Sequence, residues 1–287
     1  MSANPRKPQR IFRRDALRMC LVPPGVAVVR WMVGCGSEKQ GAVQPGGQEG
    51  PDASMKTNAD AQVDGRAVPW ATGGTKSMQN SYPDPFTTGA AGAACVLYPA
   101  QTIGPCYAQM PLTRADISDG LDGLPVRLSF LVVRSSGCIP VPDAIVDVWH
   151  SGSDGIYSAF ATGTICNPST QDVRGKTFCR GIQSTDANGR VDFNTVFPGW
   201  YRGRTIHVHF TIRLNAQGVV TSQLYFDDAL SNEILAQGIY NARGARDTTN
   251  ATDGLFLSGG ATADQVLFST AKRPDGALHA WKVLSIG

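Results

Sequence analysis

The stretch Pro198–His209 holds more chemically reactive side chains than any other part of this 287-residue chain. It contains two of the four histidines, His207 and His209, together with Tyr201 and Arg204. Successive side chains of a β-strand point to opposite faces, so two histidines spaced i and i+2 share one face. Two imidazoles on one face suit a transition metal. The spacing therefore predicts a metal site, with the phenol of Tyr201 in the preceding turn directed towards the same point.

A second tyrosine stands in a matching setting upstream. The apolar run Ile145–Trp149 leads into a turn of Ser, Gly and Asp that ends at Tyr157. One tyrosine near a turn is usually a packing residue, but two of them alongside a histidine pair make a set of four donor groups. His150 lies in the same stretch on the face opposite to Trp149, and we interpret it as a structural or pocket-edge histidine.

Four motifs in a fixed order carry a family resemblance. They read W-H-x-x-x-x-G-x-Y-S at Trp149–Ser158, F-x-R-G-x-Q-x-T-D-A-x-G at Phe178–Gly189, P-G-W-Y-x-G-R-x-x-H-x-H at Pro198–His209 and S-Q-L-Y-F at Ser222–Phe226. Together they resemble the intradiol ring-cleavage dioxygenases, from about Cys95 to Phe226. The resemblance implies a β-sandwich core whose long loops carry a metal.

The resemblance also implies particular roles for residues of this chain. A non-haem ferric ion, Fe(III), is expected to be bound by Tyr157, Tyr201, His207 and His209. Tyr201 is expected to leave the metal when substrate binds and to take up a proton. Arg204 is expected to stabilise negative charge on the substrate ring. The implied reaction is cleavage of a catechol-type diol by O2 between the two hydroxyl-bearing carbons, which yields a muconate-type diacid.

Other interpretations of these residues remain open. A ferrous or cupin-like oxygenase would use His207 and His209 with a carboxylate and would give Tyr157 no role. A non-enzymatic β-sandwich binding module would keep only the scaffold. Gln223 is implied to orient a ligand or an oxygen intermediate, but it also fits an ordinary strand glutamine. The segment T-I-G-P-C-Y departs from the family pattern at Ile103 and Cys106, which leaves the accepted ring substituents open.

Short apolar runs separated by Gly, Asp, Asn and Pro predict an all-β fold, an antiparallel β-sandwich core with long metal-bearing loops and one short helix. The helix is expected at Asp228–Gln237, with Ala229, Leu230, Ile234 and Leu235 on one side. Val208 and Phe210 are expected in the core, and His279 on the surface. The expected strands are Val126–Val133, Ile145–Trp149, Gly181–Ser184, Val191–Val196, His207–Leu214, Val219–Phe226 and Leu278–Leu284.

The basic charge of the chain is concentrated in residues 1–35. They hold seven Lys or Arg and one Asp, and since the whole chain carries +3, the +6 of this segment leaves −3 for the rest. This distribution removes the electrostatic case for nucleic-acid binding. Phe12–Arg18 resembles a bacterial twin-arginine signal, and Met32–Cys35 resembles a lipoprotein processing box. We therefore expect an exported protein, periplasmic or tethered to a membrane through lipidated Cys35; the alternative is a basic disordered N-terminus.

Residues 36–92 are rich in Gly, Gln, Ser, Asp, Ala and Pro and lack hydrophobic periodicity. They are expected to form a flexible linker before a catalytic domain at 93–287. In an oxidising compartment the domain's cysteines predict disulfides. The preferred pairs are Cys166–Cys179, which flank a loop, and Cys95–Cys138. Cys106 is then unpaired, or takes part in an alternative pair.

Overall fold

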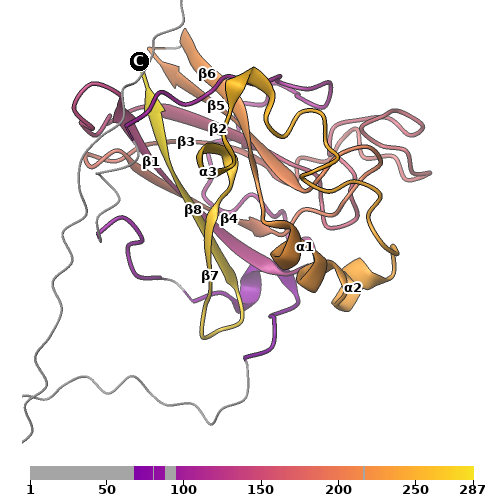
Figure 1. Cartoon of the computed structure of the whole chain (residues 1–287). Coiled ribbons are helices and arrows are strands. Elements are labelled where there is room, and N and C mark those ends of the chain that lie inside the picture. The colour runs from indigo at the N-terminus through magenta and orange to yellow at the C-terminus, as the bar shows by residue number, and fades with distance from the viewer. Residues whose placement is uncertain (1–67, 80, 88–94, 216) are drawn as a thin grey trace, which may run out of the picture. The chain divides into compact units, whose positions relative to one another are not determined.

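The apolar runs form two four-stranded β-sheets in the part of the chain that the structure describes (Figure 1). This computed structural model describes residues 68–79, 81–87, 95–215 and 217–287. The first sheet has the order β4-β1-β8-β7 and the second the order β3-β2-β5-β6. The strands are β1 (Pro125–Arg134), β2 (Ile145–Trp149), β3 (Arg180–Ser184), β4 (Arg190–Val196), β5 (His207–Leu214), β6 (Gln217–Tyr225), β7 (Ser269–Lys272) and β8 (Leu278–Ile286).

The core lies between the inner faces of the two sheets. Phe130 of β1 and Phe210 of β5 are fully buried, with ring centroids 6.4 Å apart, and they belong to one apolar cluster with Val208. The predicted β-sandwich and the core positions of Val208 and Phe210 are therefore confirmed. One pair departs from the antiparallel expectation, because β1 and β8 run parallel. Strand β7 was not predicted, because its four residues S-T-A-K show no apolar alternation.

The helices are short. The predicted helix is α1 (Asp228–Leu235), which the side chain of Asp227 caps by accepting hydrogen bonds from Ala229 N and Leu230 N. Ile234 and Leu235 are buried as expected, whereas Ala229 is exposed. The other helices are η1 (Gly74–Ser77), α2 (Gly238–Asn241), η2 (Ser258–Gly260) and α3 (Ala263–Val266). Among the described residues, no helix combines the length and the apolar character needed to cross a bilayer.

Part of the predicted linker packs on the sandwich. Trp70 Nε1 donates to Glu233 Oε1 at 2.8 Å, and Ala71 N donates to Gly276 O at 2.9 Å. Tyr82 is buried, and its hydroxyl donates to Asp275 Oδ2 at 2.7 Å. The expectation of a flexible linker is therefore wrong for 68–79 and 81–87, whose aromatic side chains find partners that the local composition does not reveal. The rest of the linker and the export signal, Cys35 included, lie outside the described residues.

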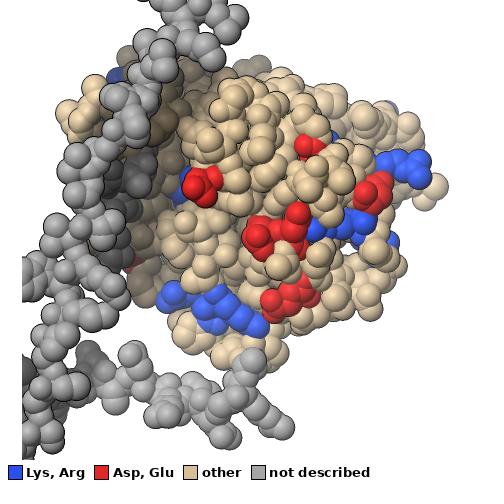
Figure 2. Space-filling view, viewed as in Figure 1, with Lys and Arg blue, Asp and Glu red and all other residues tan. Residues whose placement is uncertain are grey.

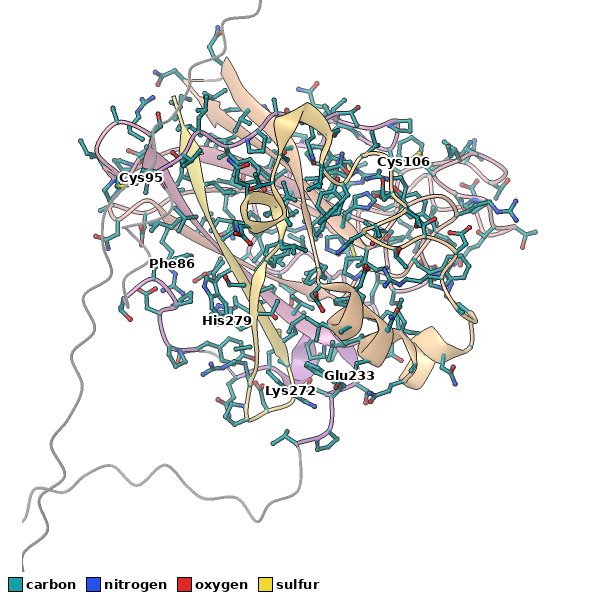
Figure 3. All side chains as sticks on the ribbon, viewed as in Figure 1. Phe86, Cys95, Cys106, Glu233, Lys272 and His279 are labelled. Atoms are coloured by element: carbon teal, nitrogen blue, oxygen red, sulfur yellow. A yellow bond between two sulfur atoms is a disulfide. The ribbon has the colours of Figure 1, made fainter. Side chains whose placement is uncertain are left out.

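The structure contains two disulfides in the part of the chain that it describes. Cys95 pairs with Cys138 as predicted, and Cys106 pairs with Cys166. The predicted pair Cys166–Cys179 is wrong, because Cys179 points into the interior beside Thr195 and is free and buried. The loop that carries Cys166 instead folds back onto the segment around Cys106. Figure 3 shows Cys95 and Cys106 in separate regions of the fold.

The visible surface is mixed in charge. Figure 2 shows acidic and basic side chains interspersed with wide uncharged areas on the face that it displays. On that face the described residues form no extended basic patch of the kind that binds a polyanion.

Candidate metal centre

A single row of side chains crosses the second sheet and forms the floor of the site. Trp149 of β2 is paired with Arg180 of β3 and with His209 of β5, and His209 is paired with Gln223 of β6. Residues directly opposite one another on paired strands lie on the same face. His207, two residues before His209, shares this face, which is the one turned away from the sandwich core.

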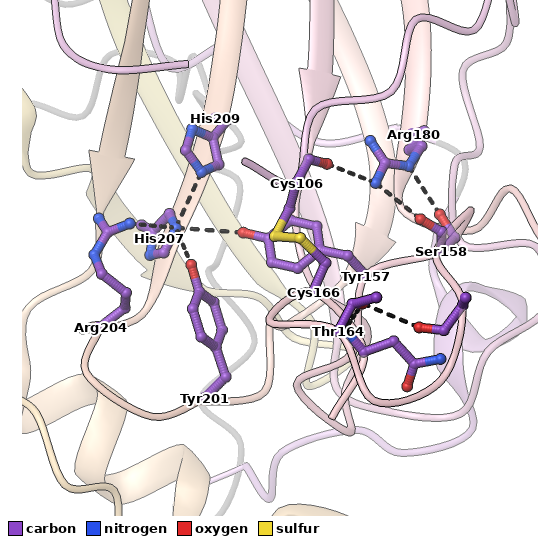
Figure 4. The surroundings of a disulfide bond; sticks show 12 residues. Cys106, Tyr157, Ser158, Thr164, Cys166, Arg180, Tyr201, Arg204, His207 and His209 are labelled. Atoms are coloured by element: carbon purple, nitrogen blue, oxygen red, sulfur yellow. Dashed lines mark hydrogen bonds between the residues drawn. A yellow bond between two sulfur atoms is a disulfide. The ribbon is translucent and has the colours of Figure 1, made fainter. Parts of the chain in front are cut away.

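Four donor atoms converge above this row (Figure 4). The Nε2 atom of His207 lies 3.2 Å from His209 Nε2, 3.1 Å from Tyr201 Oη and 3.3 Å from Tyr157 Oη. Two donors come from strand β5 and two from loops, the turn after β2 and the turn before β5. The structure therefore brings together the four residues that were predicted as metal ligands.

Burial sets the protonation states of these groups. Tyr157 is 1% exposed and the two histidines are each 2% exposed, while Tyr201 is half-buried. Burial, with a contribution from Arg204, lowers the pKa of His207 and of His209 well below the ordinary value. Both imidazoles are thus neutral and offer a lone pair. Burial raises the pKa of Tyr157, as does neighbouring Tyr201, and burial also raises the pKa of Tyr201.

The contacts of His207 fit a shared cation better than a hydrogen-bond network. Its Nδ1 lies 2.7 Å from the carbonyl oxygen of Thr205, which can only accept, so Nδ1 carries the proton and Nε2 has one lone pair. Four polar groups approach that lone pair, the fourth being Arg204 Nη1 at 3.4 Å. A metal with bonds of about 2 Å places adjacent donors roughly 3 Å apart. Two phenol oxygens and two imidazole nitrogens at these separations therefore fit a hard, highly charged metal ion.

Arg204 is fixed beside the donors by two partners. Its Nε donates to Asp253 Oδ2 at 2.9 Å, and its Nη2 donates to Gln223 Oε1 at 2.5 Å. The same Asp253 oxygen accepts from Thr205 N at 2.9 Å, so this carboxylate is engaged by Arg204 and by the backbone. Among the described residues no group of three or more His, Cys, Asp or Glu side chains is arranged to hold a metal. The carboxylate that a ferrous two-histidine site requires is not supplied by Asp253.

Gln223 lies on the site face, and its amide is held in one orientation. Besides accepting from Arg204, its Oε1 accepts from Tyr225 Oη at 3.3 Å, and its Nε2 donates to Thr102 O at 3.2 Å. Asp253 and Tyr225 were missed by the sequence analysis. Asp253 lies 49 residues from its partner Arg204, and no local pattern links the two.

The other two histidines lie elsewhere. His150 is buried, and its two ring nitrogens contact Ser151 O and Thr195 Oγ1, as expected of a structural histidine. His279 is only 1% exposed and contacts Ser129 Oγ at 2.9 Å, so its predicted surface position is wrong. The reason is the sheet order: β8 lies between β1 and β7, and Tyr82 of the N-terminal segment packs 5.6 Å from its ring.

Two further groups border the site, and the sequence analysis assigned neither of them to it. The indole of Trp149 stacks on the imidazole of His209 at 5.0 Å with an interplanar angle of 4°. The backbone of Gly104 crosses the same ring, because a Cβ at this position would lie 3.1 Å from His209 Cε1. The stretch around Ile103 and Cys106, where the sequence departs from the family pattern, therefore runs directly beside a predicted ligand.

Comparison with known proteins identifies the class of protein to which this fold and these four donor groups belong. A sequence model of a family described as "Dioxygenase" matches residues 104–268, more than half of the chain. The chain therefore belongs to this dioxygenase family, and the resemblance to the intradiol ring-cleavage dioxygenases is confirmed.

Individual relatives agree with this assignment. The chain is 30% identical over 113 residues to a chlorocatechol 1,2-dioxygenase of Pseudomonas sp. (strain P51), which covers 33% of this chain and 41% of that protein. It is 27% identical over 131 residues to catechol 1,2-dioxygenase 1 of Acinetobacter lwoffii, covering 39% of each. Thus the chain matches about two fifths of the length of these curated relatives. An intradiol ring-cleavage dioxygenase of Tetranychus urticae has a similar structure, with a TM-score of 0.61 and 28% identity, and the match covers 67% of this chain and 95% of that one.

Proposed function

We propose that this protein is an intradiol ring-cleaving dioxygenase that uses a non-haem ferric ion to cleave a catechol-type diol with O2. The observation that carries the proposal is the approach of two phenol oxygens and one imidazole nitrogen to within 3.3 Å of His207 Nε2. Phenolate oxygens stabilise the ferric state, and two neutral imidazoles limit the total negative charge. The names of the relatives support a catechol-type substrate.

The four donors have distinct roles in this proposal. Tyr157, His207 and His209 are buried and would hold the ion, which would act as a Lewis acid and lower the pKa of the phenols and of the diol. Tyr201 is the half-buried donor, so its phenol would be the one most accessible to an entering diol. Its oxygen then receives a proton from a substrate hydroxyl. Trp149, stacked on His209, excludes water from that side.

Arg204 acts on the substrate in this proposal. Its guanidinium is held by Asp253 and Gln223, and its Nη1 reaches to 3.4 Å from His207 Nε2. A fixed positive charge at this position stabilises negative charge that develops on the ring. The amide of Gln223, held by Tyr225 and Thr102, keeps that guanidinium in place.

The iron content and the visible absorption spectrum of the purified protein test the proposal. Purified protein is expected to contain about one iron per chain and to show a visible band from charge transfer between phenolate and ferric ion. Tyr157→Phe should weaken this band and abolish the formation of a muconate-type product from catechol. A ferrous two-histidine enzyme would be indifferent to Tyr157→Phe, and a binding module would purify without iron. Either result would refute the proposal.

We also propose that the protein is exported. Two disulfides among the described residues support an oxidising compartment, as do the twin-arginine-like and lipoprotein-like stretches of the leader. Expression with and without Arg13→Lys/Arg14→Lys, followed by cell fractionation, tests this. Export should fail in the double variant, and Cys35→Ser should release the protein from the membrane fraction. Equal cytoplasmic retention of all forms would contradict the proposal.

A further inference from the structure

Arg180 is a buried cation that the chemistry above does not use. It is 2% exposed, and no ion pair to a carboxylate is present for it among the described residues. Its Nη1 is buried without a hydrogen-bond partner. Burying a charge without a carboxylate partner destabilises a protein interior. The contacts of Arg180 indicate why a cation is buried at this position.

The hydrogen bonds of the Arg180 side chain all go to the two segments that carry or border Tyr157. Its Nε donates to Ser158 Oγ at 2.9 Å, and its Nη2 donates to Ser158 O at 2.9 Å and to Cys106 O at 2.8 Å. The guanidinium carbon lies 5.9 Å from the centroid of the Tyr157 ring and 5.7 Å from that of Phe160. Figure 4 shows the guanidinium connecting the Cys106 segment with the Tyr157–Ser158 turn.

The backbone conformation at Cys179 orients the side chain of Arg180 towards the site. Cys179, the preceding residue, has a φ of 57°, a left-handed conformation that few residues with a side chain adopt. It is held there by hydrogen bonds from its N to Ile117 O and from His150 N to its O. Arg180 then pairs with Trp149 and begins the row of side chains that includes His209. Local strain of this kind tends to be retained where an orientation matters.

We propose that Arg180 is a positioning residue for the ligand Tyr157. Its planar fork binds the hydroxyl and the carbonyl of Ser158 and the carbonyl of Cys106, and so holds the phenol ring beside the other three donor groups. Lysine has no such fork and bridges fewer acceptors at fixed angles. The inference rests on the proposed function, since it concerns a ligand of the proposed iron.

Ferric-ion titration and visible spectroscopy of Arg180→Met and Arg180→Lys test the inference, with Arg127→Met as the matched control. Arg127 is also buried, lies 5.1 Å from the Tyr82 ring centroid and donates to Asn194, but belongs to the other sheet. Groups that orient metal ligands typically change affinity about 10- to 100-fold. Arg180→Met should therefore lose iron affinity by that factor and shift or weaken the charge-transfer band. Arg180→Lys should restore part of both, and Arg127→Met should retain both.

The outcomes separate the two proposals. Wild-type affinity and an unchanged band in Arg180→Met would overturn the role of Arg180 alone, as would an equal loss in Arg127→Met. Should Arg180→Met not fold, Ser158→Ala removes the hydroxyl that accepts from Arg180 Nε, and unchanged iron binding and spectrum in that variant would likewise overturn the role of Arg180. Absence of iron binding in the wild type would overturn the proposed function, and the role of Arg180 with it.

Discussion

The disulfide Cys106–Cys166 is predicted to stabilise the metal centre as well as the fold. Its sulfurs pack in one buried cluster with Trp149 and Tyr157. Cys166 O accepts a hydrogen bond from Tyr157 N at 2.9 Å, and Cys106 O accepts one from Arg180. The bond therefore connects the segment that crosses His209 to the loop that carries Tyr157. Replacing both cysteines by serine should loosen both segments together.

The loss of iron affinity can be distinguished from a general loss of stability by comparing the two disulfides. The sequence separation is 60 residues for Cys106–Cys166 and 43 for Cys95–Cys138. Loop-closure entropy assigns about 4 kcal/mol of unfolding free energy to each bond. The double variants Cys106→Ser/Cys166→Ser and Cys95→Ser/Cys138→Ser should thus lose similar stability. Only the first alters the surroundings of Tyr157, so only the first should lose iron affinity, by about tenfold or more.

Denaturant unfolding and ferric-ion titration of the two double variants provide the measurements. Both should show midpoints shifted to lower denaturant by comparable amounts. Equal iron affinity in the two variants, at matched temperature and under conditions where both are folded, would refute the reasoning. It would show that the disulfide near the site contributes to the fold only.

Three further predictions concern single side chains. Gly104→Ala should weaken iron binding, because φ is +73° and the added Cβ would lie 3.1 Å from His209 Cε1. The control Gly163→Ala, where φ is +74° and no atom lies within 4 Å of the added Cβ, should lower stability without changing iron binding. Equal iron affinities of these two variants in a ferric titration would contradict this prediction. Arg204→Met should lower kcat/KM by about 10²- to 10³-fold, because it removes one preorganised charged donor. Asp253→Asn, which weakens the hold on Arg204, should cause a smaller loss. Steady-state kinetics with catechol measure both effects. Burial lowers the pKa of His150 to about 4, so the unfolded chain binds the extra proton below about pH 6.5 and the unfolding free energy of the metal-free protein should fall from there to about pH 4. His150 contributes roughly 3 kcal/mol of this fall, so urea unfolding of His150→Gln should show a weaker pH dependence, and an unchanged slope would count against it.

The sequence alone determined seven of the eight strands and the residue types of the donors. The alternation in β5 requires His207 and His209 to share one face while Val208 and Phe210 enter the core, since the period of a strand is two residues. Strands β2 and β5 begin and end at the predicted residues, because long apolar runs bounded by turns leave little choice of register. The resemblance carried by the four motifs predicted Tyr157, Tyr201, His207 and His209 as one donor set, and the structure brings their donor atoms together.

Only the tertiary structure decided which distant groups support those donors. Asp253 reaches Arg204 across 49 residues, Arg180 reaches Cys106 across 74, and Cys166 pairs with Cys106 rather than with the nearer Cys179. The packing of Trp70 and Tyr82 onto the sandwich likewise contradicts a composition typical of linkers. These contacts depend on which strands lie side by side and how loops fold back over them. Local periodicity carries no information about such long-range pairing, because it shows which face of a strand is apolar and not which distant segment packs beside it.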